Sequence, residues 1–257
     1  MLDNFELPNE TIDKMYDDIL HPAMSETGKL IGRLPRLINA AFASLDCWIL
    51  EREYHLEEIE QLLGKNLKYA DPEKIVPPEP YVAVPAIQAI SYAMNSDELR
   101  ALYANLLAKS IYSDTKESVH PAYTEIIKTL SPLDCKVFEF IMQSKCKEIG
   151  YYELRLGPIG SNSYHVAFPY LTAFPSSDPT KIAASINNLS RNMLIAPLDF
   201  RFDDDNRYAE IRETNLYKAI VDMYSSNPDG QELRPYKKSI KSTDFGRSFY
   251  DICCIPL

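Results

Sequence analysis

Apolar residues recur every three or four positions over most of the first 145 residues, which is the spacing of one buried face per helix. The pattern is densest between residues 95 and 144, where three helix starts follow one another. Asn95 with Glu98 predicts a capping box. Ser131 with Asp134 predicts another, and Pro121 suits the first turn of the helix between them. We therefore expect three short helices here, each with one buried stripe.

Residues 35–63 carry a longer pattern, with apolar side chains at alternating steps of four and three. This is the heptad spacing of a single long helix, on the order of 40 Å in length. Other side chains have to cover such a seam. Either the helices of residues 95–144 cover it within the chain, or a second copy supplies the partner helix and forms a homodimer. Because the chain has enough apolar stripes of its own, the first arrangement is favoured.

The stretch from residue 71 to residue 85 holds five prolines, which disfavours a helix and favours an extended connector. Pro85 then predicts the start of a helix with Ile87, Ile90 and Met94 on one face. The chain up to this point and through residue 130 is therefore expected to form a helical bundle.

The pattern changes after Cys146. Residues 150–172 combine aromatic and alternating apolar positions around a turn-rich centre, which predicts a β-hairpin. A helix over residues 178–192 follows, then two strand-like runs within residues 194–212, and a polar loop leads to a last helix over residues 243–253. This order of helix, helix and hairpin resembles a winged helix, in which the 178–192 helix takes the place of the recognition helix and residues 194–212 form the wing.

The expected fold class is mainly α with a small β component. A helical bundle domain over residues 1–130, which includes the one long helix, precedes a winged-helix-like α+β domain over residues 131–257. The residues we expect in the core are Leu106, Ile126, Leu130 and Phe140.

Several words of the sequence are distinctive: YANLLA at residues 103–108, HPAY at 120–123 and LSPLD at 130–134. A late T-x-x-G-x-x-F begins at Thr243. In these words and in their order the chain resembles the bacterial abortive infection alpha family, over roughly residues 30–257. The resemblance implies a place in anti-phage defence, and it offers no catalytic residue to carry over.

The formal net charge of −10 argues against a broad electrostatic attraction to nucleic acid or anionic lipid. The five cysteines form no C-x-x-C pair, and Cys47 and Cys135 take small apolar positions in helix patterns, which suits a reducing cytoplasm. The acidic start MLDNFELPNE lacks the features of a signal peptide, and no run approaches the roughly 18 uncharged apolar residues of a membrane span. We expect a cytoplasmic protein without a membrane span.

The sequence contains no nucleophile motif, no phosphate-binding glycine loop and no metalloprotease motif. Glu51, His55 and Glu58 share a helix face, but the charge around them indicates a solvated surface rather than a metal site. The three aspartates at residues 203–205 lack the later glutamate of a calcium loop. We therefore expect no catalytic residue, no metal and no cofactor.

His120 is the first candidate for a functional residue. The proline after it keeps it out of the following helix, so its imidazole either caps that helix or faces a cleft. The expected outer face of the 178–192 helix offers Lys181, Asn188 and Arg191 as possible contacts to DNA bases or phosphates.

Lys237 and Lys238 complete the set of candidates. They belong to a basic cluster that we expect in a loop and at a helix start, and its members are Arg234, Lys237, Lys238, Lys241 and Arg247. Three aspartates at the tip of the wing would repel phosphate, so nucleic acid is a possible partner but not the favoured one.

The favoured interpretation is a non-enzymatic defence protein of the abortive infection type that acts through a protein partner. Three alternatives stay open: a DNA-binding transcriptional regulator with a winged helix, an effector that perturbs membranes with the apolar face of residues 37–50, and an enzyme with an unfamiliar site.

Overall fold

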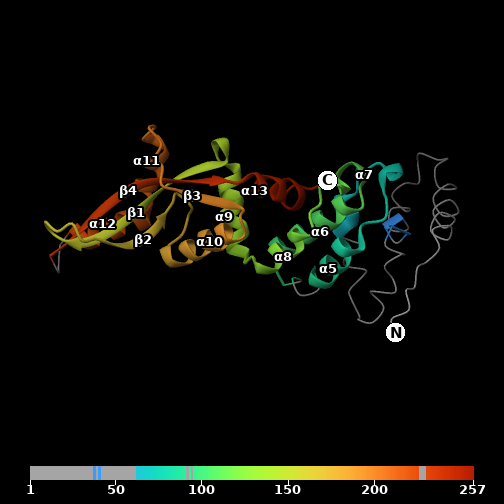
Figure 1. Ribbon diagram of the computed structural model, residues 1–257, viewed down its shortest axis with the longest axis horizontal. Coiled ribbons are helices and arrows are strands. Elements are labelled where there is room, and N and C mark those ends of the chain that lie inside the picture. Colours follow the sequence, from blue (N-terminus) through green and yellow to red (C-terminus); the bar gives the residue numbers. More distant parts are fainter. Residues whose placement is uncertain (1–36, 39, 42–61, 91–92, 94, 226–229) are drawn as a thin grey trace. The chain divides into compact units, whose positions relative to one another are not determined.

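The computed structural model of the chain describes residues 37–38, 40–41, 62–90, 93, 95–225 and 230–257 (Figure 1). These residues divide into two compact units. The first comprises the described residues up to Lys128 together with Ile252–Leu257, and the second comprises Thr129–Asp251. The described chain is mainly α-helical with one four-stranded antiparallel sheet, which confirms the predicted fold class at this level.

The first unit is built from helices. Residues 62–66 are helical, and they are followed by a 3₁₀ turn (Pro72–Lys74), α5 (Pro80–Ile90), α6 (Asp97–Ser110), α7 (Ser113–Lys116) and α8 (Ala122–Thr129). Of the long helix predicted over residues 35–63, only residues 37, 38, 40, 41, 62 and 63 are described, and these are helical. The rest of that helix, with its seam and with Glu51, His55 and Glu58, lies outside the described residues.

The proline-rich stretch differs from the prediction. Instead of an extended connector up to Pro85, the chain forms the 3₁₀ turn and then begins α5 at Pro80, so Pro85 lies inside the helix. A proline at the first position costs nothing there, because that N–H has no helical partner in any case. Pro85 removes one backbone hydrogen bond from the helix. The burial of apolar side chains on both sides of it, such as Val82 and Ile90, offsets this loss.

The three helices expected between residues 95 and 144 are present, although the first cap lies one residue later than predicted. Ser96, not Asn95, caps α6, and its hydroxyl accepts a hydrogen bond from the Leu99 N–H at 3.3 Å. Of the four expected core residues, Leu106, Ile126 and Leu130 are buried. Phe140 is half-buried, and its ring meets that of Phe174 edge-on at 5.6 Å.

The second unit combines one sheet with helices at its end and on one face. In chain order it contains α9 (Pro132–Gln143), β1 (Glu148–Pro158), β2 (His165–Leu171), α10 (Pro179–Arg191), β3 (Ile195–Leu198), α11 (Asn206–Glu213), α12 (Asn215–Ser225), β4 (Gln231–Ser242) and α13 (Asp244–Phe249). A π-helical turn (Tyr250–Cys254) follows α13, and its residues from Ile252 on belong to the first unit. The strand order is β2-β1-β4-β3, and every pair is antiparallel. Figure 1 shows the long strands β1 and β4 side by side. The hairpin of β1 and β2 and the capped helices α9 and α10 were predicted.

The wing predicted at residues 194–212 is wrong. Its first run contains β3, but its second run forms helix α11, because Tyr208 and Ile211 lie three residues apart and both reach the core on one helix face. The strand that pairs with β3 is β4, at residues where a polar loop was expected. The polar side chains of β4 gave no recognisable strand pattern. The residues that pair with them lie far away in the sequence.

One face of the sheet is covered by α11 and α12. The buried residues of this layer are Tyr152, Leu154, Leu171, Tyr208, Ile211 and Ile220. Gly150 allows the close approach of α11, because a Cβ there would lie 2.9 Å from the Tyr208 ring. This core fixes which side chains of β1 and β4 point to the opposite face.

Candidate functional site

The face of the sheet opposite α11 and α12 carries a group of tyrosines and charged residues. In the register of β1 and β4, Tyr151 lies opposite Lys238, Glu153 opposite Tyr236, and Arg155 opposite Arg234. Since side chains alternate along a strand, all six share one face, while Tyr152 and Leu154 point into the core. Tyr164 and Tyr170 join them from the loop before β2 and from β2 itself. We call this set the tyrosine–arginine face; its members are Tyr151, Glu153, Arg155, Tyr164, Tyr170, Arg234, Tyr236 and Lys238.

Aromatic and cationic side chains stack on this face. The Arg155 guanidinium lies over the Tyr236 ring at 4.4 Å from its centroid, and the Arg234 guanidinium lies over the Tyr164 ring at 4.2 Å. The rings of Tyr151 and Tyr170 are tilted against each other at 5.2 Å. A guanidinium over an aromatic face is attracted by the ring quadrupole, so these stacks hold the long arginine side chains in place.

Glu153 is the ionic centre of the face. Its carboxylate accepts hydrogen bonds from Arg155 Nε at 2.7 Å and from Lys238 Nζ at 2.9 Å. Lys238 also reaches Asp199 at 3.1 Å. Burial alone would raise the pKa of Glu153, but the hydrogen bonds and charges of Lys238 and Arg155 outweigh it and lower that pKa. The carboxylate therefore stays ionised and keeps both cations ordered.

The charges of the face balance one another. Arg155 and Lys238 pair with Glu153, Lys238 also pairs with Asp199, and Arg234 pairs with Glu232 at 3.2 Å. Three cations thus meet three carboxylates. A surface that binds nucleic acid through phosphates needs an excess of positive charge, which these pairs do not supply.

The outer part of the face is accessible. Tyr236 keeps 37% of its surface exposed, and the side chains of Arg155 and Arg234 keep 35% and 39%. Tyrosine and arginine are the residue types enriched in protein–protein interfaces and among the residues that dominate their binding energy. The face therefore has the composition of a protein-binding surface.

Lys237 and Lys238, predicted together, lie on opposite faces of β4. Lys238 belongs to the tyrosine–arginine face, whereas Lys237 forms an ion pair with Asp205 and lies 5.3 Å from the centre of the Tyr208 ring. The hydrogen bonds from Lys237 and then from Arg212 lower the pKa of Asp205.

The predicted basic cluster therefore does not exist as a patch in a loop. Four of its members lie on β4 and are divided between the two faces of the sheet, and Arg247 lies on α13. Alternation along a strand separates side chains that a loop would have kept together.

Of the candidates on α10, Asn188 holds this helix to the start of α9. The Asn188 amide donates to the Thr129 carbonyl at 2.8 Å and to the Asp134 carboxylate at 2.9 Å, next to the α9 capping box. Arg191 in turn donates to Asn188 Oδ1 at 2.8 Å. Lys181 is exposed and lies 3.6 Å from Asp178, the cap of its own helix. Asn188 thus contributes to helix packing, whereas Arg191, like Lys181, is exposed.

His120 caps the helix that follows it. Its Nδ1 accepts a hydrogen bond from the Ala122 N–H at 3.1 Å, and its ring lies 5.8 Å from that of Tyr123. The imidazole is exposed, and the contact is one of the two alternatives that its position before Pro121 predicts.

Asn105, in the word YANLLA, is a buried polar residue that sequence reasoning missed. Its amide donates to the Cys253 carbonyl at 2.8 Å, and its Oδ1 accepts from the Asn66 amide at 2.7 Å. Asn105 thus ties the middle of α6 to the C-terminal residues and to the helical segment 62–66 of the first unit. The signal was an asparagine within an otherwise apolar helix face.

The T-x-x-G-x-x-F word holds the start of α13 against the end of α10. Thr243 Oγ1 accepts from the Gly246 N–H at 2.8 Å, and the Thr243 N–H donates to the Leu194 carbonyl at 3.1 Å. A Cβ on Gly246 would lie 1.9 Å from the Leu194 oxygen, so only glycine fits. Phe249 is fully buried and meets Phe138 edge-on at 5.9 Å.

None of the helices formed by the described residues has both the length and the apolar character needed to cross a membrane. Within the same part of the chain, no three His, Cys, Asp or Glu side chains gather as metal ligands.

Comparison with known proteins identifies the family of the chain. The family model described as abortive infection alpha matches residues 51–253. No curated protein and no solved structure matches the chain.

Proposed function

We propose that the chain, which belongs to the abortive infection alpha family, is an anti-phage defence protein that acts by binding a protein partner rather than by catalysis. The observation that carries the binding part of the proposal is the tyrosine–arginine face, in which paired and stacked side chains remain accessible on a rigid sheet. A surface that is ordered before binding loses less side-chain entropy when the partner arrives.

The balance of charges supports a protein rather than a nucleic acid as the partner. Each cation of the face already has a carboxylate within 3.2 Å. A phosphate would have to displace this carboxylate or bind beside its negative charge. Asn188, one of the residues that a DNA-binding α10 would use, is engaged in packing against α9. A winged-helix-like use of α9 and α10 for protein contacts, without the predicted wing, belongs to the same proposal.

A hollow of about 510 Å³ lies beside α9, β1 and α11, among the described residues. It is lined by charges of both signs, including Lys145, Glu148 and Arg207. The hydroxyl of its serine, Ser144, donates to the backbone carbonyls of Ile141 and Glu148 at 2.6 and 3.0 Å and has no base beside it in these contacts. This arrangement supports binding over catalysis.

The further parts of the proposal are a cytoplasmic location and, as an alternative partner, a second copy of the chain paired through the long helix. The long helix lies largely outside the described residues, and the apolar stretch 37–50, which the membrane alternative uses, does so too.

The defence function is tested by phage infection of cells that express the protein. The proposal expects fewer plaques than with an empty vector and, at high phage number per cell, death or growth arrest of the infected cells. Normal plaque numbers across a broad phage panel would remove the defence assignment.

The DNA-binding alternative has its own test. Fluorescence anisotropy with mixed-sequence duplex DNA should show no binding even at low salt, where phosphate contacts are strongest. Tight binding that weakens steeply with salt would favour the transcriptional regulator instead.

A further inference from the structure

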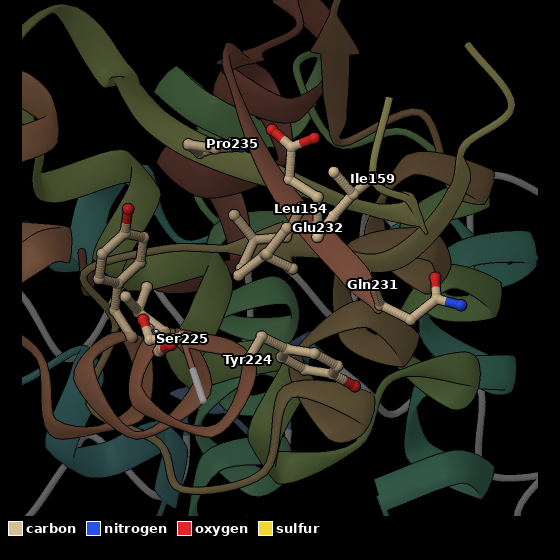
Figure 2. A pocket seen from close by; sticks show the side chains of 10 residues that line it. Leu154, Ile159, Tyr224, Ser225, Gln231, Glu232 and Pro235 are labelled. Atoms are coloured by element: carbon tan, nitrogen blue, oxygen red, sulfur yellow. Dashed lines mark hydrogen bonds between the residues drawn. The ribbon is translucent and has the colours of Figure 1, made fainter. Parts of the chain in front are cut away.

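A pocket of about 350 Å³ lies between α12 and the outer ends of β1 and β4, on the side of the sheet opposite the tyrosine–arginine face (Figure 2). Its apolar walls include Leu154, Tyr217, Val221, Tyr224, Leu233 and Pro235. Sites for small ligands in proteins have volumes of roughly 300–1,000 Å³ and mostly apolar walls with a few polar groups. The size and the lining of this hollow, which we call the α12 pocket, place it at the small end of that class.

Secondary structure sets the walls of the α12 pocket. Tyr217, Val221 and Tyr224 follow one another at steps of four and three along α12, so they share one helix face. Leu233 and Pro235 alternate on β4, and Leu154, opposite Pro235 in the register, forms the buried floor.

The two tyrosine rings are held from behind, which keeps the pocket open. The Tyr217 ring lies 5.3 Å from that of Tyr152, and the Tyr224 ring lies 6.5 Å from that of Phe168. Closing the pocket would break these aromatic contacts. The walls of the pocket are therefore fixed by the packing behind them.

Polar groups occur at the rim. The Ser225 hydroxyl donates to the Val221 carbonyl at 2.7 Å. The Glu232 carboxylate is held by Arg234 and by the Tyr164 hydroxyl, and in Figure 2 it points away from Tyr224. The Gln231 side-chain amide, also at the rim, has no hydrogen-bond partner within the part of the chain that the structure describes.

We propose that the α12 pocket binds a small, uncharged, planar aromatic molecule that offers one hydrogen bond to the Gln231 amide. Planarity follows from the two fixed tyrosine rings and the proline ring, which pack best against a flat partner. A charged molecule would lose its hydration among aliphatic and aromatic walls without gaining an opposite charge inside. This inference does not depend on the proposed function.

Indole is a suitable probe, because it is flat and uncharged and carries a single N–H donor. With the full-length protein, saturation-transfer NMR should detect indole with a dissociation constant on the order of 1 mM, as expected for a ligand of this size. Indole-3-acetate, which has the same ring and a negative charge, should bind at least about tenfold more weakly.

Variants of the protein test whether indole binds in the α12 pocket. Val221→Trp fills the pocket and should abolish the indole signal, whereas Met223→Trp, two residues on in α12 and 62% exposed, should leave it unchanged. Melting temperatures of both variants report whether the fold is kept. Gln231→Leu, a substitution at the rim, should weaken binding severalfold and serves in place of Val221→Trp if that variant unfolds.

Three results would overturn the proposal: no indole signal with the wild-type protein at millimolar concentration, an indole-3-acetate affinity equal to that of indole, or wild-type binding by a folded Val221→Trp or Gln231→Leu variant.

Discussion

At the scale of single residues, a few polar residues and one glycine make the most specific contacts in the fold. Asn105 satisfies a backbone carbonyl and a second amide inside the first unit, and Glu153 orders two cations on the sheet. Gly246 allows a backbone approach that no other residue permits. We therefore predict the effect of a substitution at these positions. A buried polar group that loses its hydrogen-bond partner lowers the stability by more than the bond itself contributed.

Gly246→Ala should destabilise the second unit strongly. The new Cβ would overlap the Leu194 carbonyl, and the backbone would have to move, at a cost of about 3 kcal/mol or more in the free energy of unfolding. Thermal unfolding followed by circular dichroism measures the effect. Gly64→Ala is the matched control, since nothing lies within 4 Å of its Cβ position and alanine favours a helix. Equal melting temperatures for the two variants would contradict the close approach at Leu194.

The ionised Glu153 should make stability depend on pH in one direction. Its pKa in the folded protein lies below the value of 4.5 for an unperturbed carboxyl, so its contribution is complete above about pH 4.5 and is lost as the pH falls through the lower folded-state pKa. Glu153→Gln should therefore lower the melting temperature most at neutral pH. The difference from the wild type should shrink at acid pH.

Glu213→Gln provides the control for this pH series. Glu213 pairs with Lys218 on an exposed surface, where ion pairs contribute little, so this variant should follow the wild type at every pH. A deficit in Glu153→Gln that stays constant from neutral to acid pH would show that the charge of Glu153 is not what stabilises the face.

At the scale of elements, the sequence predicted those helices and strands that are stabilised by contacts between residues close together in the chain. The capping box of Ser131 and Asp134, the Asp178 cap of α10 and the hairpin of β1 and β2 were all visible in the sequence, because their partners lie a few residues away. Strand β4 was missed, since Lys237 pairs with Asp205, just before α11, and Lys238 pairs with Glu153 on β1, both far away in the sequence.

The same reason explains how little of the candidate site could be predicted. Lys238 was singled out, but the tyrosine–arginine face depends on the register that brings Arg155 opposite Arg234. The available signal was the alternation of Tyr151, Glu153 and Arg155, which places three polar or aromatic side chains on one face of a strand. Without the partner strand, that alternation indicates only a strand with one polar face.

A further prediction concerns the C-terminal residues 252–257. Asn105→Ala removes the donor to the Cys253 carbonyl, so the amides of residues 252–257 should exchange with solvent faster, and the first unit should lose roughly 1–3 kcal/mol. Hydrogen exchange read by mass spectrometry measures this change. Asn66→Ala, which leaves the bond to Cys253 in place, should affect these amides less. Equal protection in Asn105→Ala and the wild type would contradict the role of this contact.

At the scale of the whole molecule, the words that carry the family resemblance coincide with contacts that hold the fold. YANLLA contains Asn105, HPAY contains the His120 cap, and LSPLD contains the capping box that also receives Asn188. These residues have structural roles. The proposed binding function therefore rests on the tyrosine–arginine face of the second unit and not on these words.

Phage plating on cells that carry Arg155→Ala together with Tyr236→Ala tests this account most directly. Both side chains are accessible, and loss of residues that dominate an interface weakens binding by at least about tenfold, so protection should fall accordingly. Tyr69→Ala, at a tyrosine that is 88% exposed in the first unit, should protect like the wild type. If the double variant is expressed, melts like the wild type and still protects fully, the tyrosine–arginine face is not where the protein acts.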